Sequence, residues 1–217
     1  MMIEEFLDYL RYERNRSPLT VKNYGDDLRA FYVFFKSLDD HLSWQSVDAD
    51  IVRDWMESMM DKGNNATSVN RRLSALRSFY RFALSRHLVD RDPAHNIEGP
   101  KTNKPLPQFL KESEMNRLLD DMEWGNSFNN VRARTIIIVF YETGIRLSEL
   151  IGLDDVSVDM EACEIKVTGK GDKQRVVPFG SEMLEALKEY VALRDSSVAR
   201  SCDAFFVTDK GCRMRPE

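Results

Sequence analysis

A stretch rich in proline between Glu98 and Pro107 constrains the fold of this 217-residue chain more than any other sequence feature. It reads EGPKTNKPLP, and its glycine and prolines prevent regular structure and favour an extended path. Apolar residues recur at helical spacing before it, whereas strand-like alternation occurs only after it. We therefore predict a helical domain at residues 1–98, a linker at 99–107 and a second domain at 108–217.

The first domain is expected to contain helices only. Ser17 and Pro18 form a strong helix start, with serine at the N-cap and proline at the first helical position. Gly63 is a stop signal for a helix that begins at Asp48 or Asp50. The predicted helices cover residues 3–12, 18–36, about 48–62 and 66–87.

The fourth of these helices has an apolar stripe and an opposite basic face. The window from Lys62 to Val89 contains six lysines and arginines and no acidic residue, so nothing in it cancels the positive charge. A merely solvated helix face usually mixes both signs, although an ordinary surface helix remains an alternative. The predicted apolar stripe consists of Val69, Leu73, Leu76, Tyr80 and Leu84. We predict that the basic face lies against a DNA groove and binds it through Asn70, Arg71, Arg72, Ser74, Arg77 and Arg81.

The second domain carries an arginine just after a glycine helix stop. Residues 143–150 read TGIRLSEL and follow the very apolar run 135–141. Gly144 is predicted to end one helix, and a new helical turn is predicted from Arg146 to Ile151. This arrangement can hold a guanidinium rigidly at a domain surface, where it could grip a phosphate.

A basic β-hairpin is predicted downstream of that arginine. Residues 164–167 and 175–178 alternate in strand fashion on either side of the glycine-rich tip GKGDKQ. Further helices and one short strand are expected near residues 112–122, 130–142, 181–194 and 204–207.

The order of these features resembles the tyrosine recombinases, the integrase and Xer family of enzymes that break and rejoin DNA. The segments SPLTVKNY at 17–24 and NRRLSALRSFY at 70–80 resemble the family's core-binding domain, and TGIRLSEL and GKGDKQRVVP its catalytic domain. The resemblance covers nearly the whole chain. It implies a mainly α, two-domain fold: a four-helix, SAM-like core-binding bundle, then a partial α/β catalytic domain with a small β-hairpin or sheet.

The resemblance also implies roles for individual residues. Arg146 would be the first catalytic arginine, which contacts the scissile phosphate, and Glu149 would support the site. Lys170 would be the catalytic lysine, with Lys173 as a rival. A fixed guanidinium stabilises charge on the non-bridging oxygens, and an ammonium can protonate the leaving 5′ oxygen, so neither metal nor cofactor is expected. The alternative is that Arg146 merely starts a helix and pairs with Glu142 or Glu149.

Lys173 and Arg175 of the hairpin are further predicted DNA contacts. The family pattern continues with a His-x-x-Arg box, a further His or Trp and a nucleophilic tyrosine. This chain has no histidine after His95, and none of its seven tyrosines matches the nucleophile's position. We therefore expect residues 1–217 to be a piece of a longer protein that binds DNA but does not cleave it.

The complete protein is expected to cleave and rejoin double-stranded DNA through a 3′-phosphotyrosine, as a homo- or hetero-tetramer. Whether that reaction serves chromosome-dimer resolution or mobile-element integration stays open. Two other functions are also open: a non-catalytic DNA-binding or accessory protein, and a helical module that binds an acidic protein partner.

Composition limits the remaining possibilities. The net charge of −5 and pI of about 5.4 argue against a protein that simply coats DNA, unless its positive charge is segregated. No apolar run is long enough to span a bilayer, and the acidic start lacks the plan of a signal peptide. The three cysteines show no metal-binding spacing. We expect a cytoplasmic protein with neither a membrane partner nor a small-molecule substrate.

Overall fold

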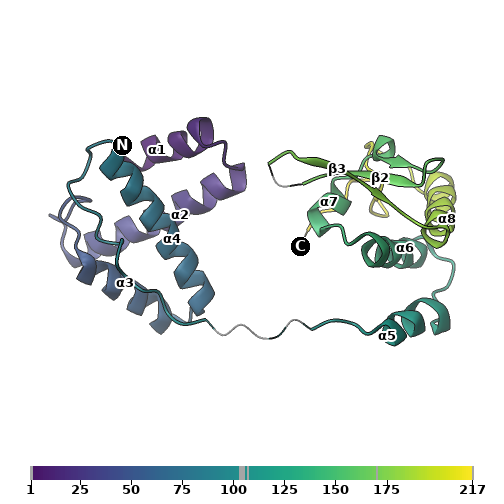
Figure 1. Cartoon of the computed structure of the whole chain (residues 1–217), viewed down its shortest axis with the longest axis horizontal. Coiled ribbons are helices and arrows are strands. Elements are labelled where there is room, and N and C mark those ends of the chain that lie inside the picture. Colours follow the sequence, from purple (N-terminus) through teal and green to yellow (C-terminus); the bar gives the residue numbers. More distant parts are fainter. Residues whose placement is uncertain (1, 103–105, 107, 170, 217) are drawn as a thin grey trace. The chain divides into compact units, whose positions relative to one another are not determined.

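The computed structural model describes residues 2–102, 106, 108–169 and 171–216. The chain forms two compact units, Met1–Leu106 and Pro107–Glu217 (Figure 1). The first unit is helical, and the second combines helices with a small antiparallel sheet. The predicted fold class is therefore confirmed. In the described part of the chain, no helix is both long and apolar enough to cross a membrane.

Helices of the first unit begin where the sequence signals placed them. The Ser17 hydroxyl accepts the backbone N–H of Thr20 at 3.2 Å, and the Asp48 carboxylate accepts two N–H groups at the start of the third helix. These contacts satisfy donors that a helix start leaves unpaired. The elements are α1 (Met2–Asp8), which continues as the π-helix η1 (Tyr9–Glu13), α2 (Pro18–Leu38), α3 (Ala49–Asp61) and α4 (Ala66–Ser85).

Helix α4 is the most buried helix of this unit. Four of the five predicted stripe residues are buried, and Leu84 is partly buried. Phe79, Phe82 and Ala83, which were not predicted in the core, are buried as well. The Phe79 ring packs against Phe6 of α1 and against Trp44, with ring centroids 5.6 and 4.4 Å apart. Because α4 packs on more than one side, only a narrow face of it remains for a partner.

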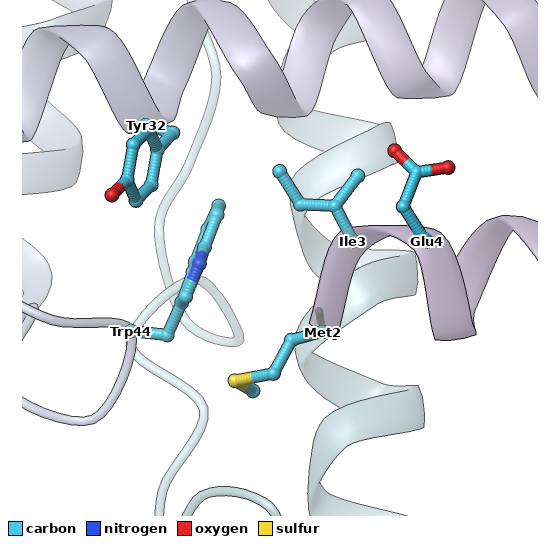
Figure 2. A pocket seen from close by; sticks show the side chains of 5 residues that line it. All are labelled: Met2, Ile3, Glu4, Tyr32 and Trp44. Atoms are coloured by element: carbon cyan, nitrogen blue, oxygen red, sulfur yellow. The ribbon is translucent and has the colours of Figure 1, made fainter.

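A pocket of about 410 Å³ lies beside this core (Figure 2). Met2, Ile3, Glu4, Tyr32 and Trp44 line it, and the Tyr32 and Trp44 rings stack with their centroids 6.2 Å apart. Figure 2 shows the Met2 side chain reaching toward the Trp44 indole. No residue predicted to act on DNA lines this pocket.

The second unit is built on helices α6 and α8, which pack against each other beside the sheet (Figure 1). The strands follow the order β1-β2-β3, and both pairs are antiparallel, so the predicted hairpin is confirmed. The helices are α5 (Glu112–Asn116), the π-helix η2 (Arg117–Asp121), α6 (Phe128–Thr143), α7 (Leu147–Ile151), the 3₁₀ helix η3 (Asp155–Ser157) and α8 (Ser181–Ser197). The strands are β1 (Val158–Asp159), β2 (Glu164–Thr168) and β3 (Gln174–Pro178).

The two hairpin strands are buried to different extents. Ile165 and Val167 of β2 are completely buried in the core of the unit, whereas most of β3 is exposed. The register pairs Val167 with Arg175 and Thr168 with Gln174. Strand β2 thus anchors the hairpin, and β3 carries Arg175 along its outer edge.

The predicted strand at residues 204–207 is wrong. Ala204 and Val207 make isolated bridges, to Asp154 and Arg213 respectively, and bends lie between them. The backbone hydrogen bonds of this segment go to loops and side chains instead of to a neighbouring strand. Phe205, for example, donates its N–H to the Leu153 carbonyl at 2.9 Å. Residues 204–207 are all buried, so this segment is an irregular loop that fills part of the core. Its short apolar run resembles a strand in the sequence.

Candidate functional site

Arg146 is the more exposed of the two catalytic-site candidates, Arg146 and Glu149, that the structure describes. Gly144 ends α6 in the left-handed conformation at φ +58°, as the sequence indicated, and lets the chain turn into α7. Ile145 and Leu150 are buried and fix this turn in the core. Arg146 occupies the N-cap position of α7, and its side chain is 73% exposed. The fold therefore presents a guanidinium at the surface from a backbone held on both sides.

Glu149 lies beneath this arginine and is almost completely buried. Its carboxylate accepts the backbone N–H of Arg146 at 2.8 Å and the Nη1 of Arg146 at 3.1 Å. Arg175 of β3 donates Nη1 and Nη2 to the two carboxylate oxygens at 2.7 and 2.9 Å. Hydrogen bonds from Arg175, and then the N–H of Arg146, lower the pKa of Glu149 to about 2 even though burial opposes this. Glu149 is thus ionised at neutral pH and joins α7 to the hairpin.

The glycine at the base of the hairpin tip fits closely against that carboxylate. A Cβ atom at Gly169 would lie 3.0 Å from the Oε1 of Glu149. The N–H of Gly169 donates to the carbonyl of Lys173 at 2.8 Å, and Lys173 itself is exposed. Lys170, the predicted catalytic lysine, lies outside the described residues. The structure therefore brings the guanidinium groups of Arg146 and Arg175 together around the Glu149 carboxylate.

The alternative pairing of Arg146 is only partly realised. Arg146 contacts Glu149 through one nitrogen, which leaves most of its guanidinium exposed. Glu142 instead accepts the N–H groups of Gly180 and Met183 at 2.9 and 3.1 Å, and so caps the start of α8.

The predicted DNA-binding residues of α4 divide into exposed and engaged groups. Ser74 and Arg81 are exposed. Asn70 donates to the carbonyl of Pro100 at 2.8 Å. Arg77 donates from Nε to the carbonyl of Ala94 at 3.1 Å and also binds the carbonyl of Ile97. Asn70 and Arg77 thus fasten the 94–100 segment to α4.

The remaining two arginines of that face share a carboxylate that the sequence analysis missed. Arg71 binds both oxygens of Asp27, on α2, and the Nε of Arg72 lies 3.6 Å from Asp27 Oδ1. The expectation that no carboxylate cancels this face is therefore wrong: the window around α4 has none, but α2 supplies one from 44 positions away. One signal was available, because Asp27 precedes Phe31 by four residues and so lies on the apolar side of α2.

In the described ranges, no group of three or more His, Cys, Asp or Glu side chains could hold a metal ion.

Two family models match the chain and together cover most of it. The model for the phage integrase N-terminal SAM-like domain matches residues 3–87, and the model for the phage integrase family matches residues 108–217. The tyrosine recombinase XerC of Escherichia coli O157:H7 is 38% identical over 213 residues, which are 98% of this chain and 70% of that protein.

Solved structures share the fold at low sequence identity. The Tn1549 transposon integrase, in complex with transposon right end DNA, aligns over 98% of this chain and 73% of its own, with a TM-score of 0.73 and 17% identity. The XerH site-specific recombinase, bound to a palindromic difH substrate, aligns over 98% of this chain and 63% of its own, with a TM-score of 0.70 and 21% identity.

Proposed function

This chain belongs to the phage integrase family of tyrosine recombinases, the enzymes of site-specific DNA recombination, and we propose that the surface around Arg146 is where it acts on the scissile phosphate. One observation carries this proposal: an exposed guanidinium is held at the N-cap of α7 by a buried carboxylate that stays ionised. A fixed cation needs little reorganisation when charge develops on a phosphate, which is the source of its catalytic value.

The proposed chemistry assigns one task to each group. When a tyrosine attacks the phosphodiester, negative charge builds on the non-bridging oxygens, and Arg146 stabilises that charge. Glu149 keeps Arg146 in place from below. Lys170 gives a proton to the leaving 5′ oxygen, and the phosphate becomes linked to the tyrosine at the DNA 3′ end. The nucleophilic tyrosine is assigned to no residue of this chain.

Double-stranded DNA is the proposed partner of the narrow face of α4. Arg81 and Ser74 are its exposed members, and Arg71 is 46% exposed at its edge. We assign Asn70, Arg72 and Arg77 to the same footprint, where their contacts with Pro100, Asp27 and the 94–97 carbonyls hold it in shape. Lys173 and Arg175 are the proposed contacts of the hairpin.

The proposed domain plan is a core-binding domain at 1–98, a linker at 99–107 and a catalytic region at 108–217. The compact units, Met1–Leu106 and Pro107–Glu217, and the two family matches support this division. We further propose that the protein acts as a tetramer on DNA, in the cytoplasm.

The experiment that tests this function separates binding from cleavage. Arg146→Ala is introduced into a recombinase that carries residues 1–217 followed by the family's His-x-x-Arg and tyrosine boxes. Formation of the covalent protein–DNA adduct should slow by at least about 10²–10³-fold, the usual cost of one transition-state donor. Affinity for duplex DNA should change little.

Arg146→Lys is the matched variant, because it keeps the charge but loses the planar donors. It should recover only a small part of the rate. Wild-type cleavage by Arg146→Ala would remove this arginine from the reaction and reject the proposed site.

A further inference from the structure

The Asp27 carboxylate of the first unit is buried, and two arginines surround it. Only 7% of its side chain is exposed, because it lies on the same side of α2 as the core residues Leu28 and Phe31. Arg71 binds its two oxygens through two separate nitrogens, and Arg72 Nε lies 3.6 Å from Oδ1. Two positive charges thus surround one negative charge, and the cluster keeps a net positive charge.

The two arginines differ in what they can still reach. The Arg72 side chain is 29% exposed, and its Nη1 contacts the sulfur of Met59 at 3.1 Å. The Arg71 side chain is 46% exposed while both of its terminal nitrogens are held by Asp27. Each terminal nitrogen carries a second hydrogen, and Nε carries another, so Arg71 keeps donors for a phosphate.

A fixed guanidinium binds a phosphate more favourably than a mobile one. An arginine at a protein surface loses rotamer freedom when it binds, at about 0.5–1.5 kcal/mol for each immobilised side chain. Two hydrogen bonds to a carboxylate that is itself buried remove most of that freedom before DNA arrives.

We propose that Asp27 is a positioning residue for DNA binding, which orients Arg71 toward the phosphate backbone at the edge of the α4 face. This inference rests on the proposed function of that face. It assigns to an acidic residue a favourable role in binding a polyanion, which charge alone would not suggest.

The sign of the effect distinguishes this role from a purely structural one. Asp27→Asn makes the protein more positive by one charge, so electrostatic attraction to DNA alone would strengthen binding. If Asp27 positions Arg71, affinity should fall instead, by about two- to tenfold, the factor that corresponds to ordering one arginine side chain. Asp8→Asn is the matched control, because Asp8 pairs with Arg11 in an exposed i,i+3 contact and its loss changes charge equally. That variant should bind as well as the wild type or better.

The experiment measures affinity of the 217-residue chain for duplex DNA at several salt concentrations, with circular dichroism to verify that each variant is folded. In an Arg71→Ala background, Asp27→Asn should cause no further loss, because there is no guanidinium left to position. Arg71→Lys should keep most of the salt dependence but lose affinity to nearly the same extent as Arg71→Ala. If Asp27→Asn does not fold at the assay temperature, the Arg71→Lys comparison decides.

The possible results separate this inference from the function on which it rests. Three results would each overturn the positioning role: tighter DNA binding by Asp27→Asn, an undiminished loss of affinity from Asp27→Asn in the Arg71→Ala background, or wild-type DNA affinity of Arg71→Lys. If Arg81→Ala still weakens binding in that case, the α4 face keeps its DNA-binding function. If neither Arg71→Ala nor Arg81→Ala weakens binding, the proposed DNA-binding function of the α4 face is itself wrong.

Discussion

Each of the two units buries one carboxylate between two arginines, but the carboxylates join different kinds of elements. Asp27 connects α2 and α4, which span 21 and 20 residues and already pack through a shared apolar core. Glu149 connects a five-residue helix to the outer strand of a hairpin. A helix that short has little stability of its own, so its position depends on contacts such as these.

The two carboxylates therefore fix the positions of different parts of the structure. In the first unit α2 and α4 pack through their apolar core, so Asp27 sets mainly where the Arg71 and Arg72 side chains lie. In the second unit Glu149 accepts a backbone N–H as well as three guanidinium hydrogen bonds, and so sets where α7 and the hairpin lie relative to each other. We therefore expect changes at Glu149 to affect reaction rate and folding, and changes at Asp27 to affect mainly affinity.

The largest effect is expected on rate, at the tip that Glu149 supports. In the recombinase with the downstream boxes, Lys170→Ala should slow cleavage by about 10²–10⁴-fold, the usual contribution of a general acid. A substrate with sulfur at the 5′ bridging position should restore the rate, because sulfur leaves without a proton.

Lys173→Ala is the control, since Lys173 lies on the same tip and is exposed. It should weaken DNA binding slightly and leave the rate with bound substrate almost unchanged. Sulfur rescue of Lys173→Ala but not of Lys170→Ala would assign the acid to Lys173.

The next effect is on folding stability and compares the two carboxylates directly. Glu149→Gln should destabilise the second unit by about 3 kcal/mol, the upper range for hydrogen bonds to a charged group, because the partly exposed Arg146 and Arg175 can reach water once the charge is gone. Asp27→Asn should cost the first unit about half as much, because Asp27 accepts two hydrogen bonds whereas Glu149 accepts four, one of them from the backbone. Trp44 and Trp55 lie in the first unit and Trp124 in the second, so urea unfolding followed by fluorescence in a Trp124→Phe background reports the first unit alone. Equal losses would contradict the comparison.

The pH dependence gives the same comparison a second readout. The pKa of Glu149 is lowered from 4.5 to about 2 in the folded protein. Its contribution to stability is therefore complete above about pH 4.5 and is lost as the pH falls toward 2. The stability difference between wild type and Glu149→Gln should be constant above pH 5 and should shrink below pH 4.

Most of the fold could be predicted because its signals are local. Ser17-Pro18, Asp48, Gly63 and Gly144 each mark a helix end through their own backbone preferences, and the hairpin is encoded by alternation around a glycine-rich tip. The strand prediction for residues 204–207 was wrong because a short apolar run has no periodicity that distinguishes a strand from a buried loop.

The site could be predicted less completely, because its partners are distant in sequence. Arg146 and Glu149 share one motif, but Arg175 reaches Glu149 across 26 positions and Asp27 reaches Arg71 across 44. A charge count within one window cannot include such a partner. The basic face therefore looked wider and more positive in the sequence than it is in the fold.

A smaller effect is expected from the glycine that lies against Glu149. Gly169→Ala should destabilise the second unit by about 1–3 kcal/mol, the usual cost of overpacking, since its Cβ would lie 3.0 Å from Glu149 Oε1. Gly180→Ala is the matched control, because its Cβ would meet its nearest atom, Glu142 Oε2, at an ordinary 3.4 Å. If Gly169→Ala unfolds no more easily than Gly180→Ala, the hairpin has room to move over Glu149, and this carboxylate does not set its position.

The smallest effect on stability is expected at Arg81. This residue tests whether changes on the α4 face of the first unit affect DNA affinity without affecting folding. Arg81 is exposed on the α4 face, so Arg81→Ala should change the free energy of unfolding by less than about 0.5 kcal/mol. If it neutralises one phosphate, its loss should weaken binding to any duplex and lower the slope of log K against log salt by about 0.9. Arg77→Ala, one turn earlier, should behave differently and cost about 1 kcal/mol of stability, because the carbonyls of Ala94 and Ile97 lose their donor. A variant of Arg81 with unchanged affinity and salt slope would mean that this face is only solvated, and would leave the hairpin as the main DNA contact.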